Sequence, residues 1–169
     1  MGSLAWWIFG NGLAFGEDAG GFVGTTGFAL RGENLYGTDS GDFKAEGYAL
    51  WLFQWAFAAT ATTIVSGAMA ERATFGAYVL HSTLITAIIY PIVAHWAWSS
   101  EGWASAARTS ADLLFGCGII DFAGSGVVHM TGGMAALVGI SILGPRAGRF
   151  NEDGTHNTMP EQSAVLQVY

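Results

Sequence analysis

The chain has 169 residues, of which 51% are hydrophobic and only 11% are charged. Soluble domains carry about 25% charged residues, so this composition favours a membrane protein. The formal net charge of −7 argues against nucleic-acid binding. Glycine accounts for 25 residues, about twice the usual share, as expected where helices pack closely.

The uncharged segments, taken in chain order, predict an all-α polytopic membrane protein. The apolar stretch 2–16 is short for a span and is expected to be part of a truncated helix. Three longer runs follow at 47–70, 75–98 and 122–144. At 1.5 Å per residue, each extends about 35 Å and can cross a hydrocarbon core of about 30 Å. A last apolar segment, 161–169, is expected to be a second truncated helix.

The segments between these runs carry most of the charge. The glycine-rich loop 17–46 contains six of the carboxylates, a tight turn spans 71–74, and longer connections cover 99–120 and 145–160. Basic residues do not settle the orientation under the positive-inside rule, because three lie on each side. On one side are Arg72, Arg146 and Arg149; on the other are Arg31, Lys44 and Arg108.

The most informative residue is His129, which lies about two turns inside the third long run. An ionisable group at that depth is costly, so it usually faces a bundle interior, a partner or a water-filled path. A helical wheel of 100° per residue predicts a His129 face made mostly of small residues, which would pack against other helices. That face comprises Phe122, Ser125, Gly126, Gly132, Gly133 and Ala136, and the opposite face comprises Val127, Met134, Val138 and Ile142. From this residue alone, a packing role and a pore-lining role are equally open.

Aromatic residues offer a second kind of chemistry. Phe53 and Phe57 are four residues apart, so their rings lie along one helix face. Aromatic rings attract cations by about 0.5–2 kcal/mol per contact. The residues alone favour ordinary packing for the Phe pair and an interfacial belt for Trp98, at the end of its run. Gln54 is expected to hydrogen-bond between helices.

Asp121, at the start of the third long run, allows two roles. It can cap backbone N–H groups at the helix start, where the helix dipole also favours a negative charge. It can also lower the potential near an outer mouth and help to hold a cation. Capping is the more common role for an acidic residue at this position, and the two roles are compatible.

Several motifs together resemble the ammonium transporter family (the Amt/Mep/Rh superfamily). The string Asp121-Phe122-Ala123-Gly124-Ser125-Gly126-Val127-Val128-His129, followed by Met130, Gly132 and Gly133, resembles the family's fifth helix. Phe53-Gln54 with Phe57-Ala58, and then 66–72, resemble the third helix and its exit; Tyr90-Pro91 with His95-Trp96 and Trp98 resemble the end of the fourth. The loop motifs Gly144-Pro145-Arg146 and Gly148-Arg149-Phe150 are closer to the plant and algal branch.

The resemblance implies a partial transporter domain over 1–169, comprising helices two to five and the start of six in an eleven-helix fold. It implies an NH4+-recruiting outer site formed by Trp98, Phe53 and Phe57 near Asp121, with Phe57 also at a gate and His129 in the pore. It further implies an integral, plasma-membrane homotrimer that conducts NH3 and H+, or NH4+, with residues 72 and 146 on the cytoplasmic side. Neither an enzyme activity nor a cofactor, a metal or a nucleic-acid partner is expected.

Two rival functions remain. An ammonium sensor could be built on the same fold without transport. A haem-binding membrane redox protein is suggested by His81 and His95, which are 14 residues apart and lie within about 40° on one helix. Two stacked haems would need a matching histidine pair on a second helix, and only His129 lies in another span.

Overall fold

The computed structural model describes residues 1–31, 45–109 and 112–158, so the apolar segment 161–169 lies outside the described residues. The first helical stretch runs through α1 (Gly2–Ala5), the π-helix η1 (Trp6–Gly10) and α2 (Asn11–Phe15). The next helix is α3 (Ala45–Met69). A third stretch comprises α4 (Phe75–Leu84), the π-helix η3 (Ile85–Ile89) and α5 (Tyr90–Trp98). The last comprises the π-helix η5 (Ser125–Met130) and α6 (Thr131–Leu143).

Three of these stretches are long and apolar enough to cross a membrane: Gly47–Met69, Phe75–Trp98 and Ser125–Leu143. The predicted all-α polytopic class is therefore confirmed for the described chain. Outside these helices, the described residues form only short elements of secondary structure. A hairpin pairs β1 (Asp18–Ala19) with β2 (Val23–Gly24), and short 3-10 turns lie at η2 (Phe28–Leu30) and η4 (Leu114–Gly116).

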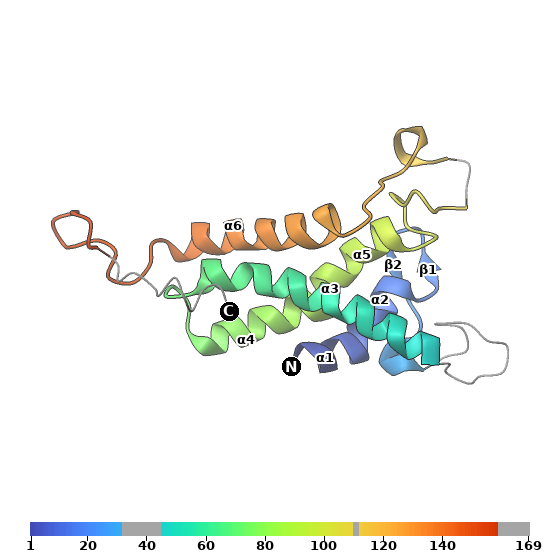
Figure 1. Cartoon of the computed structure of the whole chain (residues 1–169), viewed down its shortest axis with the longest axis horizontal. Coiled ribbons are helices and arrows are strands. Elements are labelled where there is room, and N and C mark those ends of the chain that lie inside the picture. The colour runs from blue at the N-terminus through green and yellow to red at the C-terminus, as the bar shows by residue number, and fades with distance from the viewer. Residues whose placement is uncertain (32–44, 110–111, 159–169) are drawn as a thin grey trace.

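The helices form an elongated bundle in which α3, α6 and the α4–α5 helix all run along the long axis (Figure 1). α3 packs against α6, and α2 packs against α5. The hairpin and the loop after α5 gather at one end of the bundle, and the loop after α6 extends from the other (Figure 1). Segments far apart in sequence thus meet at the end where α5 finishes.

Close packing between α3 and α6 depends on a glycine. Gly132 is buried, and a Cβ placed there would lie 2.7 Å from the carbonyl oxygen of Ala61 and 2.9 Å from Cβ of Ile64. The neighbouring Gly133 has open space around it. Only the first of these two glycines therefore brings the helices together, as small residues do in membrane bundles.

The third span begins later than the uncharged run predicted. The run starts at Phe122, but the helix starts at Ser125, and the Phe122 side chain is 99% exposed. Gly124 adopts a left-handed backbone with φ 88°, which stops the helix from extending toward Asp121. Phe122 is therefore outside the helix, and the wheel was wrong to place it beside His129.

The face of η5 that packs on the described bundle is also not the one expected from the wheel. The wheel placed Val127 opposite His129, on the face expected to avoid other helices, yet Val127 is buried and His129 is exposed. In η5 the N–H of His129 donates to the carbonyl oxygen of Gly124, five residues back, at 2.9 Å. This i→i+5 pattern turns the backbone less per residue, but over two residues it leaves Val127 and His129 on nearly opposite faces, as the wheel also has them. The wheel was therefore wrong only about which of these faces is buried among the described helices.

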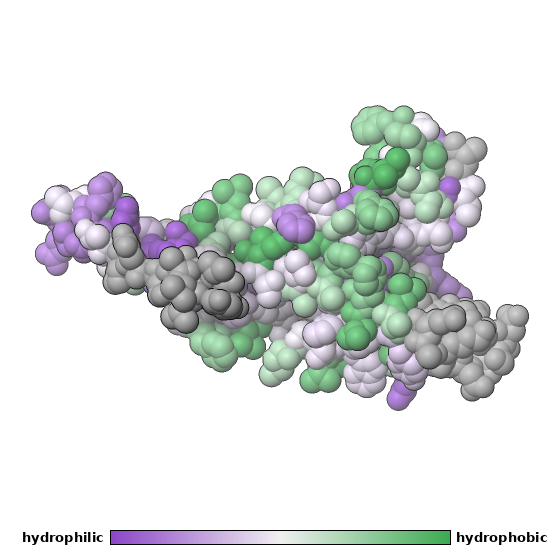
Figure 2. All heavy atoms as spheres, viewed as in Figure 1, coloured by the Kyte–Doolittle hydropathy of each residue, from purple (hydrophilic) through white to green (hydrophobic). Residues whose placement is uncertain are grey.

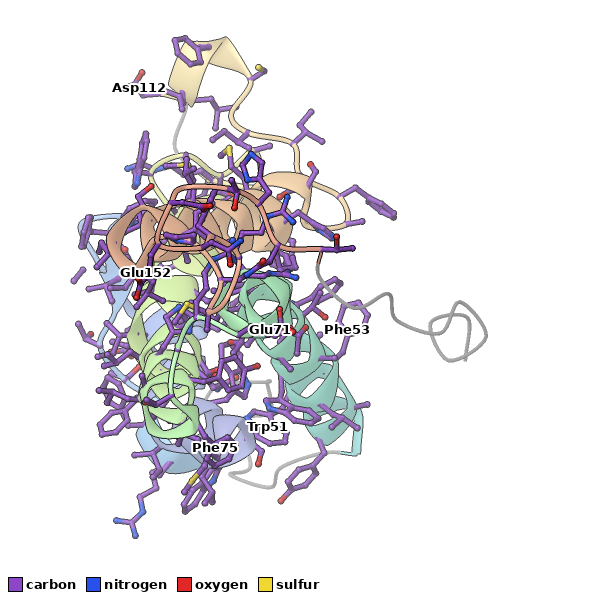
Figure 3. The ribbon with its side chains drawn as sticks, turned by 90° about the vertical axis from the view of Figure 1, so that its left-hand side faces the viewer. Trp51, Phe53, Glu71, Phe75, Asp112 and Glu152 are labelled. Atoms are coloured by element: carbon purple, nitrogen blue, oxygen red, sulfur yellow. The ribbon has the colours of Figure 1, made fainter. Side chains whose placement is uncertain are left out.

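The surface of the bundle is rich in exposed apolar side chains, which Figure 2 shows over the helices, while the loop after α6 is hydrophilic. Phe75 and Phe53 are examples that project outward (Figure 3). Exposed apolar surface of this extent is typical of contact with lipid or with further helices.

Candidate functional site

The three aromatic residues singled out from the sequence come together at one place. The rings of Phe53 and Phe57 meet edge to face, with centroids 4.9 Å apart. The ring of Phe57 meets Trp98 in the same manner at 5.3 Å. Two helices are needed for this cluster, because the phenylalanines lie on α3 and the tryptophan ends α5. The exposed Phe53 and the partly buried Phe57 and Trp98 leave aromatic surface open.

Trp98 is fixed from its polar side as well. Its indole Nε1–H donates to the backbone carbonyl oxygen of Asp121 at 2.6 Å. A tryptophan ring can move about two torsions, and here an aromatic contact and a hydrogen bond restrain both. The sequence did not reveal this anchor, since a backbone acceptor leaves no trace in residue type.

The carboxylate of Asp121 caps the start of the third span. One oxygen, Oδ1, accepts the N–H groups of Gly124 at 2.9 Å and Ser125 at 2.8 Å, and also the Ser125 hydroxyl at 3.2 Å. The other, Oδ2, accepts the N–H groups of Gly126 at 3.0 Å and Val127 at 2.8 Å. Partial burial opposes ionisation, but the four backbone hydrogen bonds prevail and lower the pKa of Asp121. The carboxylate is therefore an anion committed largely to backbone donors.

His129 has one ring nitrogen bound and the other available. Nδ1 lies 3.1 Å from the carbonyl oxygen of Gly124, the same oxygen that accepts the His129 backbone N–H. Because a carbonyl oxygen only accepts, Nδ1 carries the hydrogen, and Nε2 of the neutral ring is left as an acceptor. The ring is exposed on the described chain and lies within a π-helical turn, a feature frequent at functional sites.

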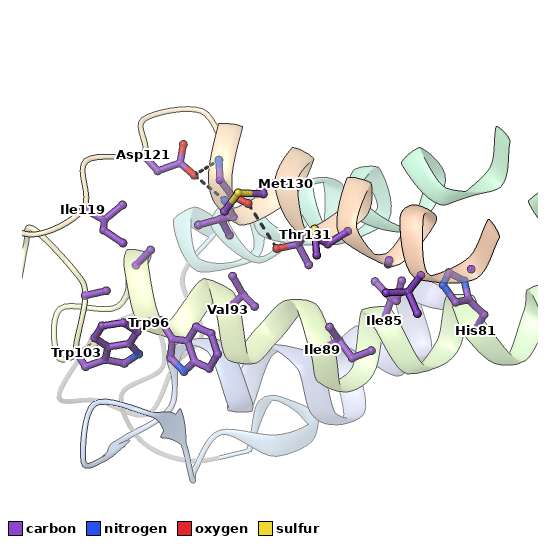
Figure 4. Close-up of a pocket in the computed structure, with 18 of the residues that line it drawn as sticks. His81, Ile85, Ile89, Val93, Trp96, Trp103, Ile119, Asp121, Met130 and Thr131 are labelled. Atoms are coloured by element: carbon purple, nitrogen blue, oxygen red, sulfur yellow. Dashed lines mark hydrogen bonds between the residues drawn. The ribbon is translucent and has the colours of Figure 1, made fainter. Parts of the chain in front are cut away.

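A cleft of about 710 Å³ runs between the α4–α5 helix and α6 (Figure 4). Its walls are almost wholly apolar, with Asp121 near one end and His81 near the other (Figure 4). None of the three clustered aromatic residues lines it, and neither does His129. The cleft is thus separate from the aromatic cluster and offers little to a cation.

Other polar residues of the spans behave differently from expectation. The side-chain oxygen of Gln54 is buried and has no hydrogen-bond partner among the described residues, so the predicted interhelical bond through it is absent there. A polar link instead joins α3 to η3, where the hydroxyls of Thr62 and Thr86 lie 3.0 Å apart. Two threonines facing each other across helices are a form of polar link that residue type alone does not single out.

The histidine pair that suggested haem ligation does not form such a site. His95 has Nδ1 at 2.9 Å from the carbonyl oxygen of Ala14 and Nε2 at 3.0 Å from Asp18 Oδ1. Both ring nitrogens are engaged, and the ring is fully buried. Within the residues that the structure describes, no group of three or more histidine, cysteine or acidic side chains could hold a metal ion.

A bundle of apolar helices of membrane length, ending in an aromatic cluster beside a capped acidic loop, defines a polytopic integral membrane protein. The profile of the Ammonium Transporter Family matches residues 1–167. The chain belongs to this family, as its motifs predicted.

Plant proteins are among the relatives, in agreement with the predicted branch. The chain is 49% identical over 167 residues to Ammonium transporter 1 member 2 of Oryza sativa subsp. japonica. It is 48% identical over 167 residues to Ammonium transporter 1 member 1 of Arabidopsis thaliana. Each alignment covers 99% of this chain and 32% of the relative, so the chain spans about a third of the length of these curated relatives.

A solved structure supports the fold. The structure titled "Sensor Amt Protein" is 35% identical in sequence and superposes with a TM-score of 0.69. The match covers 92% of this chain and 36% of that one. The predicted partial ammonium-transporter bundle is thus confirmed.

Proposed function

We propose that the full-length protein carries ammonium across the plasma membrane, as a homotrimer with one path inside each subunit. The observation that carries this proposal is the contact of Trp98 with Phe57, and of Phe57 with Phe53, at one end of the bundle. Membership of the Ammonium Transporter Family and the names of the plant relatives support the substrate.

NH4+ binds first at the aromatic cluster. The negative faces of the rings attract the cation and so replace part of its hydration. Each such contact contributes about 0.5–2 kcal/mol of binding free energy. Asp121 contributes through its negative charge, while its hydrogen bonds to backbone N–H groups keep the carboxylate from closing directly on the ion. Its role as a substrate-binding residue is thus an electrostatic one, exerted beside the rim.

The ion passes the gate at Phe57 and crosses beside His129, either as NH4+ or as NH3 after its proton has passed to Nε2 of His129. With Nδ1–H donating to Gly124, the free Nε2 of His129 accepts a hydrogen bond from ammonia or a proton from ammonium. A protonatable ring inside a span is costly unless it serves a polar path, which supports a pore-lining role.

The test of the aromatic site is Trp98→Leu in the full-length protein, with methylammonium uptake measured in cells lacking their own ammonium transporters. Loss of one cation–π contact should raise the apparent KM by about 2- to 30-fold and weaken selectivity, with nearly normal folding. Trp103→Leu is the matched control, since Trp103 is an exposed tryptophan at the same end that contacts Trp96. Equal kinetics for Trp98→Leu and the unmodified protein would assign Trp98 to the interfacial belt.

A second candidate function is ammonium sensing without transport. The observation that favours it is the likeness to the structure titled "Sensor Amt Protein". Uptake of methylammonium by the full-length protein in transporter-deficient cells separates the two functions. Binding without uptake, in protein that reaches the membrane, would support the sensor.

A further inference from the structure

The buried ring of His95 joins the last part of α5 to α2 and to β1, the strand that follows it. Nδ1–H donates to the carbonyl oxygen of Ala14 at 2.9 Å, and Nε2 lies 3.0 Å from Oδ1 of Asp18. Both ring nitrogens thus have a partner outside α5, and together the two contacts hold the ring in one orientation.

Asp18 in turn organises the hairpin of β1 and β2, in which it lies. Its Oδ1 also accepts the N–H of Gly21 at 2.6 Å, in a turn where Gly21 has a left-handed φ of 78°. The carbonyl of Gly21 accepts the N–H of Trp103 at 3.0 Å, and the carbonyl of Phe22 accepts Nε1–H of Trp96 at 2.9 Å. The hairpin thus holds both the last turn of α5 and the loop after it, below Trp96 and Trp103 in Figure 4.

Trp98 lies three residues after His95, nearly one helical turn further along α5. Helix ends fray unless they are held, and α5 ends at Trp98, where Ser99 turns to an extended backbone. The side chain of Trp98 is held by Phe57 and by the Asp121 carbonyl. The same turn is also held through His95, which bonds Ala14 of α2 and Asp18 of the hairpin.

We propose that His95 and Asp18 are positioning residues for the aromatic site. By fixing the last turn of α5 against the hairpin, the pair sets where the ring of Trp98 stands relative to Phe57. This inference rests on the proposed function, because it assigns the pair a role in ammonium binding. The pair itself does not touch the ion.

Asp18→Ala and Asp18→Asn in the full-length protein separate positioning from general structure. Asp18→Ala removes the acceptor for both His95 and Gly21. Asp18→Asn keeps an oxygen in the place of Oδ1, the atom that Gly21 and His95 both contact, so it should largely restore both contacts. The control is Glu17→Ala, which removes the same charge from the neighbouring exposed residue.

The readout is the apparent KM and Vmax for methylammonium uptake, normalised to protein at the membrane. Asp18→Ala should raise the KM about 3- to 10-fold with Vmax nearly unchanged, within the limit set by losing the Trp98 contact altogether. Asp18→Asn and Glu17→Ala should stay within about twofold of the unmodified protein. In a Trp98→Leu background, Asp18→Ala should add no further increase, because coupled residues are not additive.

Three results would overturn the inference: an unchanged KM in Asp18→Ala, an equal defect in Asp18→Asn, or the same fold increase with and without Trp98. If Trp98→Leu raises the KM and Asp18→Ala does not, only the positioning role fails. If Trp98→Leu itself changes nothing, the aromatic site and the positioning role fail together. Should Asp18→Ala not reach the membrane, Asp18→Ser takes its place, since a hydroxyl can accept from Gly21 but is too short to hold His95.

Discussion

Replacing Asp121 by Asn tests whether this carboxylate is first of all a helix cap. The amide keeps one oxygen, which can still accept from Gly124 and Ser125. Its NH2 group then faces the N–H groups of Gly126 and Val127, so two donors lose their acceptor. At about 1–2 kcal/mol for each lost bond, the variant should be less stable by about 2–4 kcal/mol.

Thermal unfolding of the full-length protein in detergent, at one fixed scan rate, measures this loss. Asp121→Asn should lower the Tm by several degrees. Since Trp98 donates to the backbone carbonyl of Asp121, which the substitution leaves in place, the KM for methylammonium should change much less than in Trp98→Leu. The control is Asp153→Asn, which removes an exposed carboxylate that bonds Thr155 and should leave the Tm unchanged.

The same cap predicts a dependence on pH. The pKa of Asp121 is lowered below its ordinary value of 3.8 by the backbone donors, despite the opposing effect of burial. Its contribution to stability is therefore fully present above the ordinary pKa and is lost as the pH falls through the lower pKa of the folded state. Asp121→Asn should lack this acid-dependent part of the Tm profile. An unchanged Tm together with a large rise in KM would refute the cap and indicate direct ligation of the cation.

Two further predictions concern the third span. His129→Ala should largely abolish ammonium flux or convert it to a less selective cation leak, whereas His129→Glu, which keeps a protonatable group, should conduct better. Uptake and current measurements check this. Wild-type flux and selectivity in His129→Ala would leave His129 with a packing role only. Gly132→Ala should destabilise the full-length protein by about 1–3 kcal/mol, because the added methyl group overlaps α3. Gly133→Ala, in open space, should be neutral or slightly stabilising. Equal Tm values for the two variants would contradict this account of α3–α6 packing.

The apolar runs by themselves determined the class of the protein and the course of its spans. Charged side chains are costly in a bilayer and are therefore rare in a span. An uncharged run of about 24 residues thus predicts a membrane-spanning helix. Helices from Ala45 to Met69 and from Phe75 to Trp98 follow the runs 47–70 and 75–98 closely. The local motifs around Phe53, Trp98 and Asp121 were also enough to indicate the family, which the comparisons then confirmed.

The tertiary structure decided which side chains meet, because contacts across helices depend on backbone path and phase rather than on residue type. The start of the third span moved to Ser125 through the Asp121 cap and the left-handed Gly124. The face of η5 that carries Val127 is the one buried against the described helices, and a wheel, which gives only the angles between residues, cannot foresee this. The pair of His95 with Asp18 joins residues 77 positions apart, and only the folded chain brings that imidazole and that carboxylate within a hydrogen bond of each other.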